Sequence, residues 1–334
     1  MIDEIVREDL ENIRERLSHD FKNERVLVTG GAGFLGSWIC DVLVEEGAAV
    51  VCLDNLASGL KSNIDHLLGR KNFEFLQHDV TEPIPMRKDF DLVIHMASRA
   101  SPFEFERFPI EILKANTVGT LNALEIAMRS GARFLFASSS EIYGDPEVVP
   151  TPESYNGNVD PVGPRSCYEE SKRAGEALVA AYKSQYGLDA RIARIFNTYG
   201  PRMRADGIYG RVVPRFIKQA LNNEPLTVFG NGFQTRSFIY VSDQIEGLLR
   251  FASSEEAKGE IINLGNDVEM RIMDLAKLIK RLLGSKSEIS LNPLPAGDPR
   301  RRCPDITKAK KILKWEPRIS IEEGLRRTCK WFSK

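Results

Sequence analysis

The most constraining feature of the sequence is a glycine-rich stretch, TGGAGFLG at residues 29–36, between a predicted strand and a predicted helix. The strand is the apolar run from Arg25 to Thr29, and the helix covers about Phe34 to Gly47. Short, continuously apolar strands are typical of parallel sheets that are buried on both faces. A tight turn from such a strand into a helix presents backbone N–H groups at the positive helix end, where they can bind a phosphate.

Strands and helices alternate along the first 200 residues. We predict further strands at 49–53, 73–77, 91–95, 134–137 and 190–195, and helices at 110–130 and 168–185. This alternation is typical of a Rossmann-like, doubly wound parallel sheet of the α/β class. After residue 200 the regularity breaks, with predicted helices at 212–222, 242–253 and 272–283 and strands at 226–229 and 261–264.

We therefore predict three parts. Residues 1–23 form an amphipathic helical extension, which docks on the body or on another subunit; its apolar residues at helical spacing are Ile2, Val6, Leu10, Ile13 and Leu17. Residues 24–200 form a dinucleotide-binding domain, and residues 201–334 form a smaller mixed α/β lobe that binds the substrate. Such a lobe is expected to close over the carboxyl ends of the strands, where ligands bind in these folds.

Composition excludes several kinds of partner. The 46 Lys and Arg balance 47 Asp and Glu, so bulk nucleic-acid binding has no electrostatic support. No apolar run approaches the roughly 18 residues that a membrane span needs. The 5 cysteines are scattered without a C-x-x-C motif, which favours reduced thiols in a cytoplasmic protein. The 4 histidines form no metal-ligand pattern, so we expect no metal site.

The glycine stretch favours a dinucleotide cofactor. Gly30, Gly33 and Gly36 have the spacing G-x-x-G-x-x-G, and alone they are also compatible with a plain tight turn. Asp54 closes the next predicted strand, roughly 20 residues further on, where a carboxylate binds the adenosine ribose. Because this carboxylate would repel a 2′-phosphate, the pattern favours NAD over NADP.

Tyr168 and Lys172 lie four residues apart and therefore on one helix face. A nearby ammonium lowers the pKa of a phenol, so we expect Tyr168 to act as a base toward a substrate hydroxyl. Lys172 can also hold the ribose of a nicotinamide. Such a pair is common on ordinary helices, and its weight comes from its combination with the glycine stretch and a serine run.

That serine run, residues 138–140, and Glu141 directly follow the predicted strand 134–137 and so lie at the carboxyl end of the sheet. We predict that Ser139 orients the substrate. Glu141 indicates that oxidation is not the whole reaction; the alternative is a solvated loop charge. Arginines in the second half match phosphate oxygens, although at least one of the cluster 300–302 is expected to form a surface salt bridge.

Three long stretches carry a resemblance to a known family: SSEIYGDPEV at 139–148, GPRSCY at 163–168 and ARIFNTYGPR at 193–202. With the glycine stretch they resemble the extended short-chain dehydrogenase/reductase family over nearly everything after residue 24. Within it, the chain resembles the UDP-glucuronate decarboxylases, also called UDP-xylose synthases. The 4-epimerases usually carry a small or hydroxyl residue at position 141, and the 4,6-dehydratases an Asp-Glu pair at 140–141, whereas this chain has Ser140 and Glu141.

The resemblance implies NAD-dependent decarboxylation of UDP-glucuronate to UDP-xylose through a 4-keto intermediate, with internal return of hydride. Tyr168, aided by Ser139 and Lys172, would remove the C4 hydroxyl proton, and Glu141, if burial raises its pKa, would protonate C5. A homodimer through the helices near 110–130 and 168–185 is also implied. A 4-epimerase, a 4,6-dehydratase and, more distantly, a non-catalytic NAD-binding scaffold remain as alternatives.

The resemblance also implies the contacts of the two ligands. The expected NAD contacts are Gly30, Gly33, Phe34, Leu35, Gly36, Asp54, Asn55, Asp79, Val80, Ala97, Tyr168 and Lys172. The expected contacts of the UDP-sugar are Arg165, Asn197, Arg211, Val212, Phe229, Arg236 and Arg301. Whether Arg236 binds only phosphate or also acts on an enolate stays open at this level.

Overall fold

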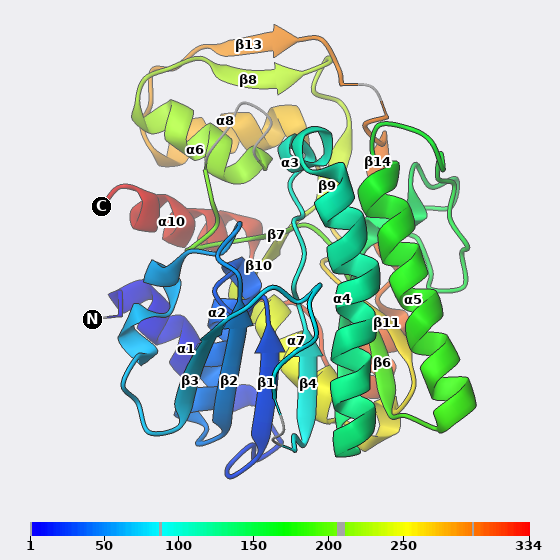
Figure 1. Ribbon diagram of the computed structural model, residues 1–334. Helices are drawn as coiled ribbons and strands as arrows, with labels where there is room; N and C mark the ends of the chain where they lie inside the picture. The colour runs from blue at the N-terminus through cyan, green and yellow to red at the C-terminus, as the bar shows by residue number, and fades with distance from the viewer. Residues whose placement is uncertain (1, 87–88, 206–210, 296) are drawn as a thin grey trace.

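A seven-stranded, fully parallel sheet forms the centre of the computed structural model, which describes residues 2–86, 89–205, 211–295 and 297–334 (Figure 1). Its strand order is β11-β6-β5-β4-β1-β2-β3. The strands are β1 (Arg25–Thr29), β2 (Ala49–Asp54), β3 (Phe73–Gln77), β4 (Leu92–His95), β5 (Arg133–Ser139), β6 (Ala190–Ile195) and β11 (Ile261–Leu264). The predicted doubly wound α/β fold is confirmed.

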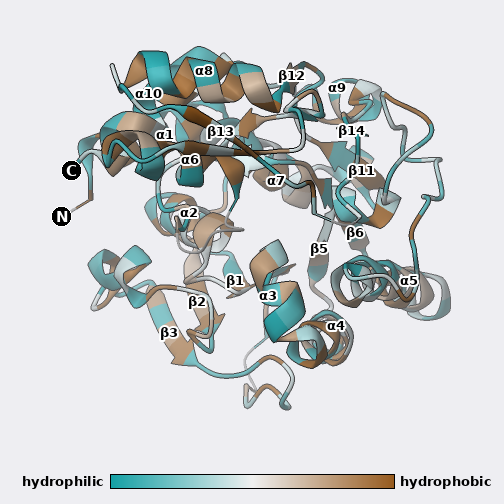
Figure 2. Ribbon diagram, turned by 90° about the horizontal axis from the view of Figure 1, so that it is seen from above, coloured by the Kyte–Doolittle hydropathy of each residue, from teal (hydrophilic) through white to brown (hydrophobic). Residues whose placement is uncertain are grey.

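Helices cover both faces of this sheet, as Figure 2 shows from above. One face carries α2 (Phe34–Glu45) and α7 (Val241–Ser253), and the other carries α4 (Pro109–Ser130) and α5 (Ser166–Tyr186). Along β1, Val26 and Val28 pack in the cluster on the α2 side, whereas Leu27 packs in the opposite cluster. Because both faces are buried, the strands read as continuous apolar runs.

The N-terminal helix α1 (Glu4–Arg16) docks on the body of its own chain. Its apolar face, which includes Val6, Leu10 and Ile13, is buried in the same cluster as α2 and α7. Asp9 is buried with them; it accepts a hydrogen bond from Tyr240 Oη at 2.6 Å and pairs with Arg327 at 3.0 Å. The helix is shorter than the predicted extension 1–23, and it covers the α2 side of the molecule.

The second half builds a lobe above the carboxyl ends of the strands (Figure 1, top). A pair of parallel strands, β8 and β13, and a three-stranded sheet in the order β12-β9-β14 form its strands. The other α-helices and β-strands of the second half are α6 (Val212–Leu221), β8 (Leu226–Phe229), β9 (Thr235–Ser237), β10 (Ile239–Tyr240), β12 (Glu269–Arg271), α8 (Ile272–Leu282), β13 (Ile289–Asn292), β14 (Arg301–Arg302), α9 (Thr307–Leu313) and α10 (Ile321–Phe332). The first half also contains α3 (Pro102–Arg107) and β7 (Thr198–Tyr199).

The predicted boundary at residue 200 does not separate two bodies. β11, from the second half, pairs with β6 and completes the large sheet, with Ile261 opposite Ile192. Helix α7 likewise packs on that sheet rather than in the lobe. The reason lies in long-range pairing: an apolar strand of four residues carries no local mark of which sheet it will join.

Within the described ranges, no helix is long and apolar enough to cross a membrane. The same residues contain no group of three His, Cys, Asp or Glu side chains that could hold a metal ion. The cysteines Cys40, Cys52, Cys167, Cys303 and Cys329 are all buried and free.

Candidate active site

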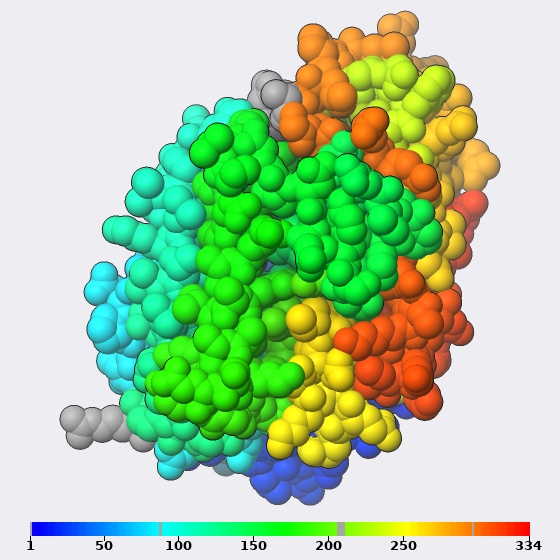
Figure 3. Space-filling model, turned by 90° about the vertical axis from the view of Figure 1, so that its right-hand side faces the viewer, coloured from blue at the N-terminus to red at the C-terminus, as the bar shows by residue number. Residues whose placement is uncertain are grey.

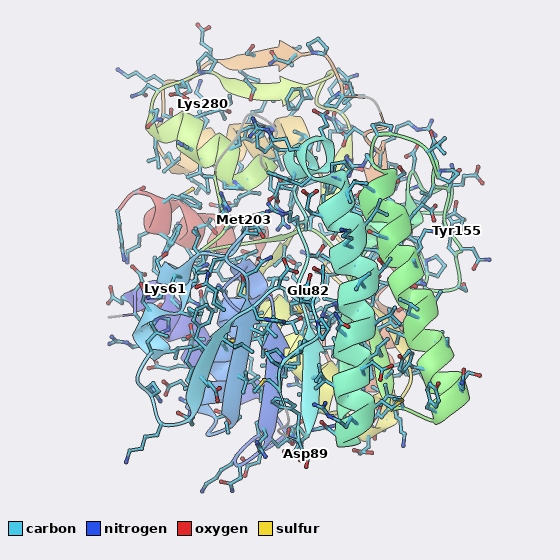
Figure 4. All side chains as sticks on the ribbon, in the orientation of Figure 1. Lys61, Glu82, Asp89, Tyr155, Met203 and Lys280 are labelled. Atoms are coloured by element: carbon cyan, nitrogen blue, oxygen red, sulfur yellow. The ribbon has the colours of Figure 1, made fainter. Side chains whose placement is uncertain are left out.

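A cavity of about 1120 Å³ lies between the carboxyl ends of the strands and the lobe. Met203, labelled in Figure 4, marks its place between the top of the sheet and α6. With the exception of Arg301, every residue predicted from the sequence to contact NAD or the UDP-sugar, and every predicted catalytic residue, lines this cavity. The sequence motifs, separated by up to two hundred residues, therefore converge on one site.

The glycine turn allows unusually close backbone contacts at the floor of the cavity. A Cβ on Gly36 would lie 2.1 Å from the carbonyl oxygen of Gly30, and one on Gly30 would lie 2.8 Å from Ala97 Cα. Gly33 caps α2 without a side-chain hydrogen bond to its first N–H groups. Backbone N–H groups at a helix N-terminus, next to a turn that only glycine fits, suit the pyrophosphate of a dinucleotide.

Asp54 ends β2 and lines the same part of the cavity. It accepts hydrogen bonds from the N–H groups of Ala32, at 3.0 Å, and Leu56, at 2.8 Å. Burial raises the pKa of this carboxyl group, and the two backbone hydrogen bonds oppose that shift. Asp54 thus braces the turn, and its placement fits a carboxylate facing an adenosine ribose.

Tyr168 and Lys172 lie on the cavity side of α5, below the end of β5 that carries Ser139. Burial raises the pKa of Tyr168 to about 12, although a hydrogen bond with Ser139 opposes the shift. Burial also lowers the pKa of Lys172 to about 7, and its Nζ donates to the carbonyl of Ala137 at 2.8 Å. The expected lowering of the Tyr168 pKa is therefore wrong for this structure, because burial of the phenol outweighs the neighbouring charges.

Glu141 lies in a short 3₁₀ turn, Ser140–Tyr143, that follows β5 directly. Its Oε2 pairs with Arg165 Nη2 at 2.5 Å, and its Oε1 pairs with Arg302. Burial pushes the pKa of Glu141 upward, but the two guanidinium groups outweigh it and hold the pKa well below its usual range. The condition that burial raises the pKa of Glu141 is thus not met here, because two cations, which the sequence does not bring together, meet at this carboxylate.

Arg165 has a second carboxylate partner, Glu169, whose Oε1 lies 3.2 Å from its Nε. Glu169 is buried, and burial together with the charge of Glu141 raises its pKa to about 6. Glu169 was not among the site residues predicted from the sequence. Its only signal was the i,i+4 spacing to Arg165, which is shared by many surface pairs.

The lobe supplies the opposite wall of the cavity. Arg236 is buried and pairs with Asp298 at 3.0 Å. Phe229 has the guanidinium of Arg215 4.8 Å from its ring centroid. Asn197 Nδ2 is buried and has no hydrogen-bond partner among the described residues. A buried amide without a partner costs free energy unless a ligand or water satisfies it, so it fits a ligand-binding wall.

Arg301 is the predicted site residue that the structure places elsewhere. Its side chain is 53% exposed and pairs with Glu269 at 2.5 Å, outside the cavity. Its neighbour Arg302 is 3% exposed and lines the cavity beside Arg236. Successive residues of a strand point to opposite faces, so only one of the two can face the site, and the local sequence does not say which.

The chain matches a known family over most of its length. Residues 26–265 match the "NAD dependent epimerase/dehydratase family". The chain belongs to this family. The resemblance to extended short-chain dehydrogenases/reductases is confirmed, and the family's dependence on NAD agrees with the glycine turn and Asp54.

Relatives within this family share about half of the residues. UDP-glucuronic acid decarboxylase 1 of Xenopus tropicalis is 47% identical over 345 residues, covering 100% of this chain and 80% of that protein. The protein of the same name from Danio rerio is 50% identical over 311 residues, covering 93% of this chain and 73% of its own length. UDP-glucuronic acid decarboxylase 5 of Arabidopsis thaliana is 48% identical over 304 residues, with 91% and 87% covered.

Solved structures of family members have the same fold. A UDP-glucose 4-epimerase from Thermotoga maritima, with UDP-glucose, superposes with a TM-score of 0.85 at 33% identity, covering 92% of this chain and 98% of that chain. The Thermus thermophilus UDP-glucose 4-epimerase complex with NAD superposes with a TM-score of 0.81 at 30% identity, covering 92% of this chain and 98% of that chain.

Proposed function

We propose that this chain converts UDP-glucuronate into UDP-xylose and CO2, with NAD as an internal carrier of hydride. The observation that carries the proposal is Glu141, held beside Tyr168 between Arg165 and Arg302. This arrangement supplies cations for a sugar carboxylate and a carboxyl group for proton transfer, without the second acid at position 140 that a dehydratase would need. Relatives named UDP-glucuronic acid decarboxylase support it.

The residues at the sheet end are suited to hold NAD. The turn at Gly30–Gly36 would bind the pyrophosphate and Asp54 the adenosine ribose, while Lys172 would hold the nicotinamide ribose. The adenine would be bordered by Asn55, Asp79 and Val80. The side chain of Asn55 donates a hydrogen bond to Asp79 at 2.8 Å. When bound, NAD supplies the chemistry of taking a hydride from C4 of the sugar and giving it back.

The protein's own part is to move protons and to stabilise charge. Tyr168, with Ser139 and Lys172, takes the proton of the C4 hydroxyl. The resulting 4-keto sugar acid is a β-keto acid, which loses CO2 and leaves an enolate. The cations of the site stabilise this enolate, and Glu141 delivers a proton to C5.

The lobe would bind the nucleotide part of the substrate. Arg211, which is half-buried, and Arg236, which is buried, both line the cavity, and burial lowers the pKa of both. Guanidinium groups match the geometry of a diphosphate. Phe229 flanks the uracil, with Asn197 and Val212 nearby. We assign Arg302, rather than Arg301, to the substrate.

The test is to incubate the protein with NAD and UDP-glucuronate and to follow CO2 and the sugar product by NMR. We expect CO2 together with UDP-xylose. Release of CO2 together with a free 4-keto pentose would support the decarboxylation and would show that the hydride does not return to the sugar. UDP-galacturonate without CO2 would make the chain a 4-epimerase, and in that case Glu141→Ala should leave the chemistry largely intact.

We further propose that the protein works as a homodimer in the cytoplasm. Helices α4 and α5 lie side by side (Figure 1), and α4 exposes 58% of Ile110, 36% of Leu113 and 40% of Val118. Apolar side chains on one helix suit a partner helix. The five free cysteines suit a reducing compartment, and cell fractionation would test that location.

A further inference from the structure

One guanidinium group in the site is shared by two carboxylates from different segments. Arg165 contacts Glu141 through Nη2, at 2.5 Å, and Glu169 through Nε, at 3.2 Å. The three side chains are only 14%, 16% and 7% exposed. Because the two contacts use different nitrogen atoms, Arg165 can give up one of them and keep the other.

The charged groups that are linked to Glu141 by direct contacts are balanced. In direct contact, Arg165 and Arg302 offset Glu141 and Glu169. The charged and titratable groups that face Glu141 are Arg165, Tyr168 and Glu169 at α5, Arg211 at the start of α6, Arg236 on β9 and Arg302 on β14. A sugar carboxylate that enters this site adds a third negative charge to the two carboxylates in contact.

The proposed reaction consumes a proton. The bond from C5 to the carboxylate breaks, its electron pair stays on the sugar as an enolate, and CO2 leaves. A proton then forms the new C5–H bond. The hydride that goes to NAD returns, so redox balances within the site, but one proton per turnover must come from solvent.

We propose that the substrate carboxylate replaces Glu141 on Arg165 Nη2 while Glu169 keeps Arg165 in place, and that the released Glu141 takes up the proton that C5 receives. The inference rests on the proposed function and deepens it. Arg165 becomes the residue that binds the carboxylate, and Glu169 becomes a positioning residue that acts through Arg165.

Electrostatics favour this exchange. In the structure Glu141 is ionised, because two guanidinium groups outweigh the effect of burial on its pKa. Moving Arg165 to the substrate removes one of them and brings a negative charge closer. Burial then favours the protonated carboxyl group. Proton uptake is thus coupled to the arrival of an acidic sugar and not to that of a neutral one.

The test measures proton uptake on binding. Tyr168→Phe protein with NAD, in which oxidation is blocked, is titrated with UDP-glucuronate in weak buffer containing a pH indicator, and calorimetry gives the amount bound. We expect uptake of about one proton per UDP-glucuronate bound and none with UDP-xylose, which lacks the carboxylate. Adding Glu141→Gln should abolish the uptake, and adding Glu169→Gln should leave it.

Full binding without uptake would overturn the exchange, as would uptake that survives Glu141→Gln and disappears with Glu169→Gln. CO2 release by the unaltered protein is measured in parallel. If it occurs while the Tyr168→Phe protein takes up no proton, the exchange fails and the proposed function stands. If no CO2 appears, the proposed function itself fails.

The positioning role of Glu169 has a separate readout. In the otherwise unaltered protein, Glu169→Gln should raise the KM for UDP-glucuronate several-fold and leave inhibition by UDP-xylose unchanged. Glu169→Asp should restore part of the loss. The control is Glu170→Gln, since Glu170 is the next residue along α5 but pairs with Arg173, at 3.5 Å, outside the cavity. Equally weakened binding of UDP-glucuronate and UDP-xylose would show that Glu169 does not position Arg165 for the carboxylate.

Discussion

Tyr168 and Lys172 show how strongly burial sets the chemistry of single residues in this site. The pKa of Tyr168 is raised to about 12 and that of Lys172 is lowered to about 7, with burial as the largest cause of both shifts. In this structure Tyr168 is therefore neutral near neutral pH, and Lys172 is close to its own midpoint of protonation. Tyr168 can act as a base only when nearby positive charge helps to remove its proton, which links proton transfer to a filled site.

Tyr168→Phe should remove this proton transfer and keep the ring in place. We expect the rate of CO2 release to fall by about 10²- to 10⁴-fold, with circular dichroism and the thermal midpoint little changed. Tyr182→Phe is the matched control, because Tyr182 lies on the same helix but outside the cavity, where it contacts Glu125. An equal fall in both variants would mean that α5 had been disturbed, and no fall in Tyr168→Phe would exclude Tyr168 as the base.

At the residue scale, local motifs predicted part of the site. The glycine turn, Ser139, Tyr168 and Lys172 were predicted because their local motifs, taken together, indicate one chemistry. The choice of Arg302 over Arg301 and the ionisation of Glu141 were not predicted. Both depend on β14 approaching the turn after β5, across a sequence separation of 161 residues. No pattern within one segment reports such a contact.

Among the elements, α1 is held to the body partly through a buried carboxyl group. Burial of Asp9 raises its pKa to about 6, although its contacts with Tyr240 and Arg327 oppose the shift. The folded state therefore favours the protonated form. The protonated carboxyl group of Asp9 stabilises the folded state fully below about pH 4, and this stabilisation is lost as the pH rises through about 6.

Asp9→Asn should consequently stabilise the protein at neutral pH. A shift of roughly two units corresponds to about 3 kcal/mol at most, so we expect a gain of about 1–3 kcal/mol at pH 8 that disappears near pH 4. Urea unfolding at both pH values measures it. Asp65→Asn, at an exposed pair with Lys61, should change stability by less than about 0.5 kcal/mol. A loss of stability at pH 8 would show that the pair with Arg327 outweighs burial.

Most elements followed from the sequence. Strands β1, β3, β6, β8 and β11 have the predicted bounds, because short apolar runs flanked by polar or glycine residues are a local signal. β5 runs to Ser139 instead of ending at residue 137, so part of the serine run belongs to the strand. The short strands β7, β9, β10, β12 and β14 were missed, since two or three residues show no periodicity.

At the scale of the whole molecule, the loop after Gly144 ties the catalytic turn to the C-terminal segment. Thr151 donates its N–H to the carbonyl of Cys303 at 2.8 Å, and Asp305 returns a hydrogen bond to Thr151 at 3.0 Å. Figure 3 shows this loop, in green, lying against the orange C-terminal segment. The segment that places Arg302 beside Glu141 is therefore held by β9 before residue 303 and by Thr151 after it.

The proposed dimer predicts a change in mass when the exposed face of α4 becomes charged. Leu113→Glu together with Val118→Glu should convert a dimer into a monomer in light scattering, because the like charges would have to be buried at the interface. Lys61→Glu, at an exposed position away from α4, is the control for the same change in charge. A monomeric parent protein, or a double variant that stays dimeric, would contradict the proposed interface.

The return of β11 to the large sheet has a consequence for engineering. A chimaera joined at residue 200 would pair β6 of one parent with β11 of the other, and so place the junction inside the large sheet. Exchange of the substrate lobe between relatives should instead replace two insertions, residues 201–240 and 265–305, and keep the connecting residues 241–264 with the parent sheet. The substrate contacts that we assign to the lobe therefore come from two separate blocks, which have to be transplanted together.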